Sequence, residues 1–281
     1  VAHQVAELMR QRTYQIGCGY EDADDCDHLR ADPALKTAVG RDPADDPDLG
    51  SQPTMTRLEN AVTTRDLLRL GYAFIDQFIA SYDAPPEVIV LDMDPTTDHA
   101  HGHQQLTFFN AYEDEYCFMP FHVYEGLSGK YITSVLRAGK TPTAPEIISV
   151  MKRIVTSFQV AGAKYLYETV YCGRGKMELM IKDHKVALKS DRTSCHRKEA
   201  NQFRLFIHSA AYVLMHALRE NLLRSSELAR AQFDTIRLRL LKIGTRIEVG
   251  KTFIRFHFPA SYPMQPILAR SSAMLTALNT S

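Results

Sequence analysis

A mixed α/β fold, with helices and strands in one chain, is predicted by three stretches near the middle of the sequence. Residues 87–94 are a short apolar run that ends on carboxylates, as a buried strand does when it carries an acid to a site at its end. Residues 117–125 and 131–137 flank a glycine-containing connection and predict a hairpin. Residues 146–158 follow a proline and carry apolar residues at helical spacing, which predicts a helix.

Residues 1–84 predict a helical N-terminal region with an acidic loop. Residues 5–9 already carry apolar side chains at helical spacing, so we expect further sequence upstream of Val1. Residues 21–53 are rich in Asp and Pro, a pattern typical of turns and solvated loops. A helix is predicted at 63–82, because a threonine cap precedes an apolar stripe.

Residues 201–281 predict a separate C-terminal region with helices, strands and a basic surface. Helices are expected at 201–223 and 226–233, and strands at 235–241 and 246–258. Basic residues alternate with apolar ones along these strands, as on strands with one buried and one solvated face. The alternating basic residues are Arg237, Arg239, Lys242, Arg246, Lys251 and Arg255.

Charge is distributed unevenly along the 281 residues, although the net charge is zero. Residues 161–281 hold 20 Lys and Arg against 9 Asp and Glu, whereas residues 1–100 hold 8 against 19. A basic half predicts a nucleic-acid partner, because each neutralised phosphate releases counterions; two solvated faces of opposite sign are the alternative. No apolar run approaches the ~20 residues of a membrane span. The five cysteines form no C-x-x-C pair, which favours a reducing cytoplasm.

Four residues form the most specific pattern in the chain: Tyr171, Arg174, Glu178 and Lys185. On a helix, their spacings of three, four and seven bring them to one face, where a carboxylate lies in line with two cations and a phenol. Such a face suits a metal ion and a phosphate backbone. The spacing Y-x2-R-x3-E-x6-K resembles the signature helix of IS4-type bacterial insertion-sequence transposases, whose catalytic core is an RNase H-like DDE domain.

The resemblance covers nearly the whole chain. Residues 190–205 (Ser-Asp-Arg-Thr-Ser-Cys-His-Arg-Lys-Glu-Ala-Asn-Gln-Phe-Arg-Leu) resemble the IS1380 family within this group. Residues 19–35 and 51–60 are similar to it as well. The resemblance implies that residues 85–200 are an RNase H-like DDE catalytic core, between the helical N-terminal region and the helix-plus-strand C-terminal region.

The resemblance also implies DNA cleavage and strand transfer at insertion-sequence ends, with two Mg²⁺ ions held by two aspartates and a glutamate. Asp94 matches the first aspartate, because Asp94-Pro-Thr-Thr is similar to the Asp-x-Thr that follows the family's first strand. Glu178 matches the glutamate. The residues that match DNA-phosphate contacts are Tyr171, Arg174 and Lys185.

The second aspartate of the family has no counterpart. In relatives it ends a strand that follows the helix predicted here at 146–158, but between that helix and Glu178 the sequence has one acid, Glu168. We therefore expect an internal deletion near residues 159–162. The deletion would remove the strand beside that of Asp94, leave an apolar edge liable to mispairing, and leave two Mg²⁺ ions with too little negative charge.

Three other acids do not complete the site in this interpretation. Asp92 is the alternative to Asp94, and we expect its side chain on the opposite face of the strand. Asp183 lies about 140° around the helix from Glu178. Asp191 lies beyond that helix, so neither of the last two replaces the missing aspartate.

A second possible metal-binding pattern follows Asp98, where histidines occupy alternate positions: His99, His101 and His103. In an extended chain they lie on one side and suit Zn²⁺ or Ni²⁺, but a specific site needs a fourth ligand and supporting hydrogen bonds. We interpret the run as similar to the family's polar segment after its first aspartate. Cys172 has basic neighbours but no partner for a nucleophile–base pair.

The sequence thus predicts a DDE transposase that acts on the terminal inverted repeats of its element, in the bacterial cytoplasm and at the nucleoid. It is expected to work as a homodimer on DNA, with Mg²⁺, and to be a defective copy. The alternative is a non-catalytic remnant that binds DNA ends or dimerises with an intact transposase. A third alternative is a chain that does not fold stably, because of its exposed edge.

Overall fold

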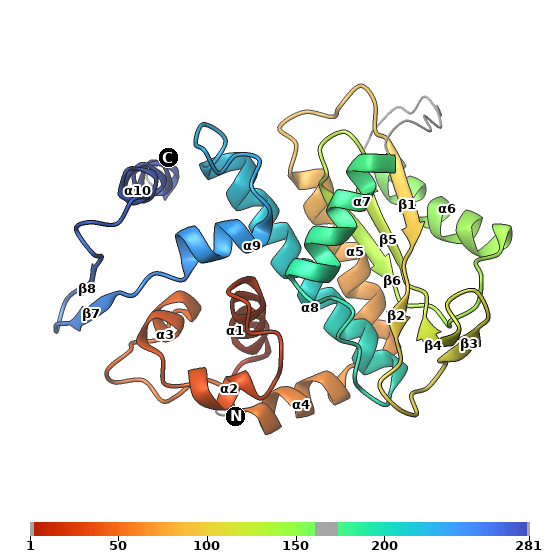
Figure 1. The fold of residues 1–281 in the computed structure, drawn as a ribbon, viewed down its shortest axis with the longest axis horizontal. Coiled ribbons are helices and arrows are strands. Elements are labelled where there is room, and N and C mark those ends of the chain that lie inside the picture. Colours follow the sequence, from red (N-terminus) through yellow and green to blue (C-terminus); the bar gives the residue numbers. More distant parts are fainter. Residues whose placement is uncertain (1–2, 161–173, 280–281) are drawn as a thin grey trace. The chain divides into compact units, whose positions relative to one another are not determined.

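Helices and strands form a mixed α/β structure, which confirms the predicted fold class (Figure 1). The computed structural model describes residues 3–160 and 174–279. Within these residues the strands form three small sheets, and every strand pair in them is antiparallel.

The chain divides into two compact units. The first combines the two ends of the chain, Val1–Arg57 and Ala210–Ser281, and the second is Leu58–Ser209. The divisions fall inside two helices, α4 (Gln52–Ala61) and α8 (Lys198–Ala217). These units do not follow the three consecutive domains expected from the sequence, which stay a prediction.

The main sheet of the second unit has three strands: β1 (Leu91–Pro95), β5 (Phe121–Glu125) and β6 (Tyr131–Val135). They pair in the order β1-β5-β6, so β5 is central. The strand predicted at 87–94 is confirmed, although it begins at Leu91, and the predicted hairpin is formed by β5 and β6. Glu125 stabilises the turn, because its carboxylate accepts a hydrogen bond of 2.7 Å from the backbone N–H of Ser128.

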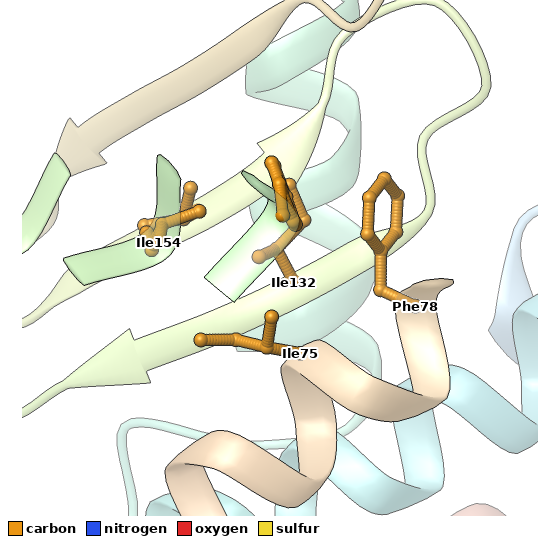
Figure 2. Packing of buried hydrophobic residues seen from close by; sticks show 6 residues of the cluster. Ile75, Phe78, Ile132 and Ile154 are labelled. Carbon is orange, nitrogen blue, oxygen red and sulfur yellow. The ribbon is translucent and has the colours of Figure 1, made fainter. Parts of the chain in front are cut away.

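One face of this sheet is covered by two helices, α5 (Thr64–Ala80) and α6 (Ala144–Val160). Ile75 and Phe78 from α5 meet Ile132 of β6 and Ile154 of α6 in the core cluster shown in Figure 2. All four side chains are at most 4% exposed. Burial of apolar surface therefore fixes both helices on the sheet.

Both helices begin at residues that satisfy their free backbone N–H groups. Thr63 and Asp66 form a reciprocal capping box at the start of α5, as the threonine predicts. At the start of α6, the carboxylate of Glu146 accepts hydrogen bonds of 2.8 Å from the backbone N–H and the hydroxyl of Thr143. These bonds, together with one from Arg137, lower the pKa of Glu146 to about 2.

The opposite face of the sheet is covered by α7 (Arg174–Lys182), which continues into the π-helix η1 (Asp183–Ala187), and by the first half of α8. The alternation of side chains along β5 shows this division. Val123 packs in the cluster with α5 and α6, whereas the next residue, Tyr124, bonds to His184 of η1 at 2.7 Å.

A second small sheet has three short strands: β2 (Asp98–His99), β3 (Phe108–Asn110) and β4 (Glu115–Phe118). They pair in the order β2-β4-β3. The single strand predicted at 117–125 is therefore wrong, because its residues belong to β4 and β5 in different sheets. Pro120 lies between the two strands and has no backbone N–H to continue a ladder.

The first unit begins with helices α1 (Val5–Gly17), α2 (Asp25–Leu29) and α3 (Pro33–Val39). The loop predicted over 21–53 is thus partly helical, and its acids act locally. Asp32 accepts a hydrogen bond of 2.7 Å from the N–H of Leu35 and caps α3, and Asp27 accepts one of 3.0 Å from the N–H of Gln52. The Asp and Pro residues that predict a loop start helices in this part of the chain.

The C-terminal part of this unit differs from the prediction in three places. The strand predicted at 235–241 is helical, formed by α9 (Phe233–Ile236) and the π-helix η3 (Arg237–Leu241). Phe233, Ile236 and Leu240 are buried, and their spacing of three and four is the helical one. Arg237 and Arg239 therefore do not alternate on a strand.

The other two differences lie on either side of this helix. Turns replace the helix predicted at 226–233, since the Ser226 hydroxyl bonds the backbone of Leu223 and Leu228 instead. The end of the chain forms a helix that the sequence analysis missed, α10 (Gln265–Asn279). Between them, β7 (Arg246–Val249) and β8 (Ile254–His257) pair as a hairpin, which confirms the strands predicted at 246–258.

Strand β1 lies at the edge of the main sheet in the part of the chain that the structure describes, where it pairs with β5 alone. This edge strand carries Asp94, which is exposed, and ends at Pro95. Charged residues and proline are the features by which natural edge strands avoid pairing with other chains. The edge strand is therefore less apolar than predicted.

The core assignment predicts different effects for two identical substitutions. Ile75→Ala removes a side chain that is 4% exposed and should lower the free energy of unfolding by about 2–5 kcal/mol. Ile148→Ala on α6 removes one that is 50% exposed and should change it by less than about 0.5 kcal/mol. Urea unfolding of both variants measures the difference, and equal effects would contradict the packing in Figure 2.

Candidate functional site

The two aspartates of β1 lie on the same face of the sheet. Asp92 pairs in register with Tyr124 and Asp94 with His122. The expectation that Asp92 faces the opposite side is wrong, because residues two apart on a strand share a face. Asp94 is exposed and Asp92 is half-buried, with its pKa raised by burial and by the charge of Glu125.

The signature residues lie on and before α7. Tyr171 is outside the described residues, and Arg174 begins the helix. Glu178 is exposed, whereas Lys185 falls in the π-helix and is half-buried. The α-helix changes to a wider π-helix between Glu178 and Lys185. The two side chains therefore lie in different environments. Asp183 is 3% exposed, which confirms that it lies on a different face from Glu178.

A buried group of polar side chains joins this helix to the sheet. The rings of His122 and His184 lie 4.8 Å apart, and His122 also bonds the Ser134 hydroxyl at 2.8 Å. The Ser209 hydroxyl donates its proton to the carbonyl of Leu205 at 2.8 Å. Nε2 of His184, 3.3 Å from that hydroxyl, must therefore donate to it, and Nδ1 accepts from Tyr124.

Burial keeps both histidines neutral. It lowers the pKa of His184 well below its usual value, with further lowering by His122 and His208. It also lowers the pKa of His122, to about 3, with a contribution from the charge of Lys185. A neutral imidazole that both donates and accepts a hydrogen bond can join the sheet to the helix without a buried charge.

Contacts along the two segments show that they run in the same direction. Lys185 Nζ donates a hydrogen bond to the carbonyl of Thr97, and further along both segments Gln104 donates to the carbonyl of Thr193. The order of the contacts therefore aligns the chain after Asp94 with the chain after Glu178.

Asp94 and Glu178 both precede the contact between Lys185 and Thr97, on β1 and on α7. Asp94 comes three residues before Thr97, and Glu178 comes seven residues before Lys185. Both carboxylates are exposed.

The described residues do not fit two metal ions. Among them, no three side chains of His, Cys, Asp or Glu are grouped so that they could hold a metal. A site with two Mg²⁺ ions needs at least three carboxylates, from different parts of the chain, to bridge the ions and balance their charge. Asp94 and Glu178 would supply only two of them.

The histidine run after Asp98 forms a different structure from the one expected for a metal site. His99 lies on β2, and its Nδ1 is 2.5 Å from the carboxylate of Glu115 on β4. His101 and His103 lie in the exposed connection that follows. Gln104, at the end of the run, is buried and donates a hydrogen bond of 2.8 Å to the carbonyl of Cys195. The run therefore connects the second sheet to the segment at 190–205.

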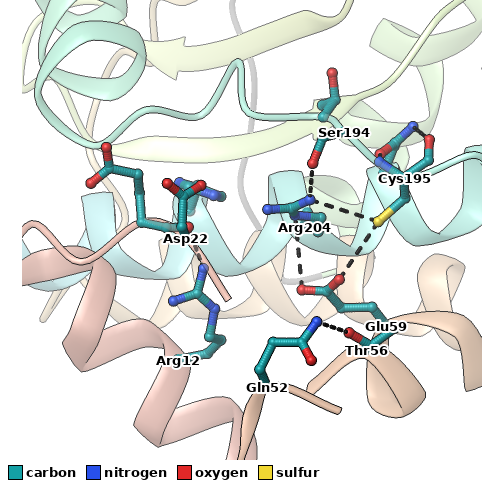
Figure 3. Close-up of polar contacts among 12 residues, drawn as sticks. Arg12, Asp22, Gln52, Thr56, Glu59, Ser194, Cys195 and Arg204 are labelled. Atoms are coloured by element: carbon teal, nitrogen blue, oxygen red, sulfur yellow. Dashed lines mark hydrogen bonds and ion pairs between the residues drawn. The ribbon is translucent and has the colours of Figure 1, made fainter. Parts of the chain in front are cut away.

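That segment is held by a buried ion pair, shown in Figure 3. Arg204 of α8 lies 3.8 Å from the carboxylate of Glu59, and each side chain is 8% exposed. Arg204 also bonds the Ser194 hydroxyl at 2.5 Å, and the Cys195 thiol lies 3.6 Å from Glu59. The residues that resemble the IS1380 family are thus largely structural in this chain.

Sequence reasoning missed three buried polar residues of the site: Asp98, His122 and His184. His122 has a polar side chain inside a predicted apolar hairpin strand, and His184 lies within the signature helix. A polar residue in an apolar stretch was the available signal. It could not be used because the partner of each residue lies on a distant segment.

The neutral histidines predict a stability that falls in acid. Their folded pKa values lie below the unfolded value of about 6.5, so the unfolded chain takes up protons first as pH decreases. Their contribution is present above pH 6.5 and is lost below it, and for His122 the loss at pH 5 is roughly 2 kcal/mol. Burial raises the pKa of Asp98 to about 8, so this group contributes stability that increases as pH falls. The measurement therefore uses the Asp98→Asn background, in which this opposite effect is absent.

Urea unfolding at pH 7 and pH 5 tests this expectation. Adding His184→Gln to the Asp98→Asn background should reduce the loss of stability between the two pH values, because one titrating group is removed. An unchanged pH dependence would show that His184 is not buried in the neutral form.

The sequence profile described as "Transposase DDE domain group 1" matches residues 1–161 and 151–280. No curated protein and no solved structure matches the chain. Across residues 3–160 and 174–279, no helix is both long enough and apolar enough to cross a membrane. The two matched stretches cover almost the entire sequence, and the chain therefore belongs to the transposase DDE domain family, group 1.

Proposed function

We propose that this chain is a catalytically defective DDE transposase of the IS1380 type, which binds the terminal inverted repeats of its element without cleaving them. The observation that carries the proposal is the incomplete carboxylate site. In this proposal Asp94 and Glu178 face one ligand, and no group of three carboxylate, histidine or cysteine side chains among the described residues could hold a metal. Two carboxylates balance only half the charge of two Mg²⁺ ions.

The family match supports an internal deletion as the cause. The first matched stretch ends at residue 161 and the second begins at residue 151, so the two meet at the predicted deletion near 159–162. An uninterrupted domain is expected to match as one stretch. Helix α6 ends at Val160, and α7 begins only fourteen residues later at Arg174. The family's second aspartate and its strand would lie between them.

DNA binding does not require the missing carboxylate. Residues 161–281 hold 20 basic residues against 9 acidic ones, and electrostatic attraction to phosphates needs only accessible positive charge. We propose Arg174 and Tyr171 as contacts to the DNA ends, in keeping with the signature that they match. A homodimer on DNA, at the bacterial nucleoid, is the expected form of such a protein.

The alternative within the same family is an active enzyme in which another carboxylate replaces the missing one. It would carry out Mg²⁺-dependent cleavage and strand transfer, with Asp94 and Glu178 as ligands. The exposure of both side chains favours access to DNA and to metal. Only the active enzyme would cleave DNA, so cleavage distinguishes this alternative from a protein that only binds the DNA ends.

The first experiment measures binding and nicking in the same samples. The wild-type chain, mixed with a labelled duplex that carries the terminal repeat, should shift the duplex on a gel with and without Mg²⁺. It should release no nicked strand, and Asp94→Asn and Glu178→Gln should bind as the wild type does. Nicking that depends on Mg²⁺ and disappears in Glu178→Gln would overturn the proposal.

The second experiment tests Arg174 as a phosphate contact. Arg174→Ala should weaken binding to all duplexes and lower the slope of log K against log salt by about 1, because one fewer counterion is released. The matched control is Arg153→Ala, which removes an exposed arginine from α6 on the other face of the sheet. Equal slopes for both variants would exclude Arg174 as a contact.

A further inference from the structure

The first unit contains a large apolar cavity that is lined by helices from both ends of the chain. Its volume of about 880 Å³ lies within the ~300–1,000 Å³ that is typical of small-molecule sites. The apolar wall includes six leucines: Leu29, Leu35, Leu214, Leu218, Leu241 and Leu275. Empty apolar space of this size lowers the stability of a protein, so the cavity favours an apolar occupant.

One wall of the cavity carries a buried hydrogen-bond donor without an acceptor. Gln15 of α1 lines the cavity and is 1% exposed. Its amide oxygen accepts hydrogen bonds from the Arg12 guanidinium at 3.5 Å and from the Cys26 thiol at 3.2 Å. Because Arg12 can only donate, the amide oxygen must face it, and the amide NH₂ is left without a partner among the described residues. Such a donor is unfavourable until an acceptor binds it.

A cation also lines the cavity. Lys242 is exposed, and its Nζ lies 4.4 Å from the centre of the ring of Tyr20, which lines the cavity as well. The acid among the described lining residues is Asp32, whose carboxylate accepts the N–H of Leu35 as the cap of α3. The cavity thus combines a long apolar wall with an amide donor and a positive charge.

We propose that this cavity binds an amphiphilic carboxylate of the fatty-acid class, with its head group at Gln15 and Lys242 and its alkyl chain along the leucines. The carboxylate supplies the acceptor that the Gln15 amide lacks, and its charge is complementary to that of Lys242. The chain removes apolar surface from water. A folded partner protein is a poorer fit, because Gln15 is 1% exposed and a slender ligand is needed to reach it.

Isothermal titration calorimetry of the full chain with dodecanoate, below the concentration at which it forms micelles, measures this binding. Dodecyltrimethylammonium has the same alkyl chain and the opposite charge, so it tests the head group. Lys242→Met removes the cation from the cavity. Its matched control is Lys251→Met, because Lys251 is an exposed lysine in the turn between β7 and β8.

A second pair of variants tests the cavity itself. Ala217→Phe, at the end of α8, places a ring in the cavity and should not lower the urea midpoint of unfolding, because the ring fills apolar space. Ala273→Phe on α10 adds the same ring at an exposed position.

We expect one saturable site for dodecanoate and binding of dodecyltrimethylammonium that is at least about tenfold weaker, because the cationic head offers no acceptor. Lys242→Met should weaken dodecanoate binding about tenfold through the loss of a charged contact. Ala217→Phe should abolish binding, and both controls should bind as the wild type does.

Three results would overturn the proposal: no saturable binding of dodecanoate, equal affinity for the two amphiphiles, or dodecanoate binding that Ala217→Phe leaves unchanged. The comparison of the two amphiphiles uses the wild-type chain, so it remains decisive if the added ring prevents folding. None of these measurements involves DNA, so failure of this proposal and failure of the proposed function are separate outcomes.

Discussion

The attachment of α7 and η1 to the face of the main sheet is the constraint on which the candidate site depends. This face carries Asp92 and Asp94 on β1 and His122 and Tyr124 on β5. Polar groups buried there need partners, and His184 supplies one by bonding Tyr124 at 2.7 Å. The helix that carries Glu178 is therefore held by neutral hydrogen bonds as well as by apolar packing.

Burial shifts the pKa values of several groups at this attachment. It lowers the pKa of His184 and raises the pKa of Asp98 to about 8, so burial favours the neutral form of both side chains at pH 7. Both groups lie a few residues from the proposed ligands Asp94 and Glu178. If the second aspartate is lost, as we propose, cleavage can be abolished while the surrounding structure persists, because none of these contacts uses that residue.

The sequence predicted the parts of the fold that rest on local patterns. The capped helix after Thr63, the hairpin around residues 126–130 and the apolar strand before Asp94 were all found, because spacing and capping are local properties. The strand predicted at 235–241 is wrong, although alternating Arg and Leu are compatible with a strand. Phe233, Ile236 and Leu240 are buried at helical spacing, and the segment is helical. That outcome depends on tertiary packing.

The site was predicted only in part for a similar reason. The signature spacing identified the segment with Glu178, and the end of the apolar strand identified Asp94. The contact of Lys185 with Thr97 could not be predicted, because the two residues are 88 positions apart in the sequence. The seven-residue spacing also assumed one regular helix, whereas the helix widens at Asp183.

We propose that this chain cannot hold two metal ions at once, as DDE cleavage would require. Titration of the free protein with Mn²⁺, followed by electron paramagnetic resonance, counts the bound ions directly. We expect fewer than two ions per chain, with any bound ion lost in Asp94→Asn or Glu178→Gln. Two ions bound together, both released by Glu178→Gln, would contradict it and show that another carboxylate completes the site.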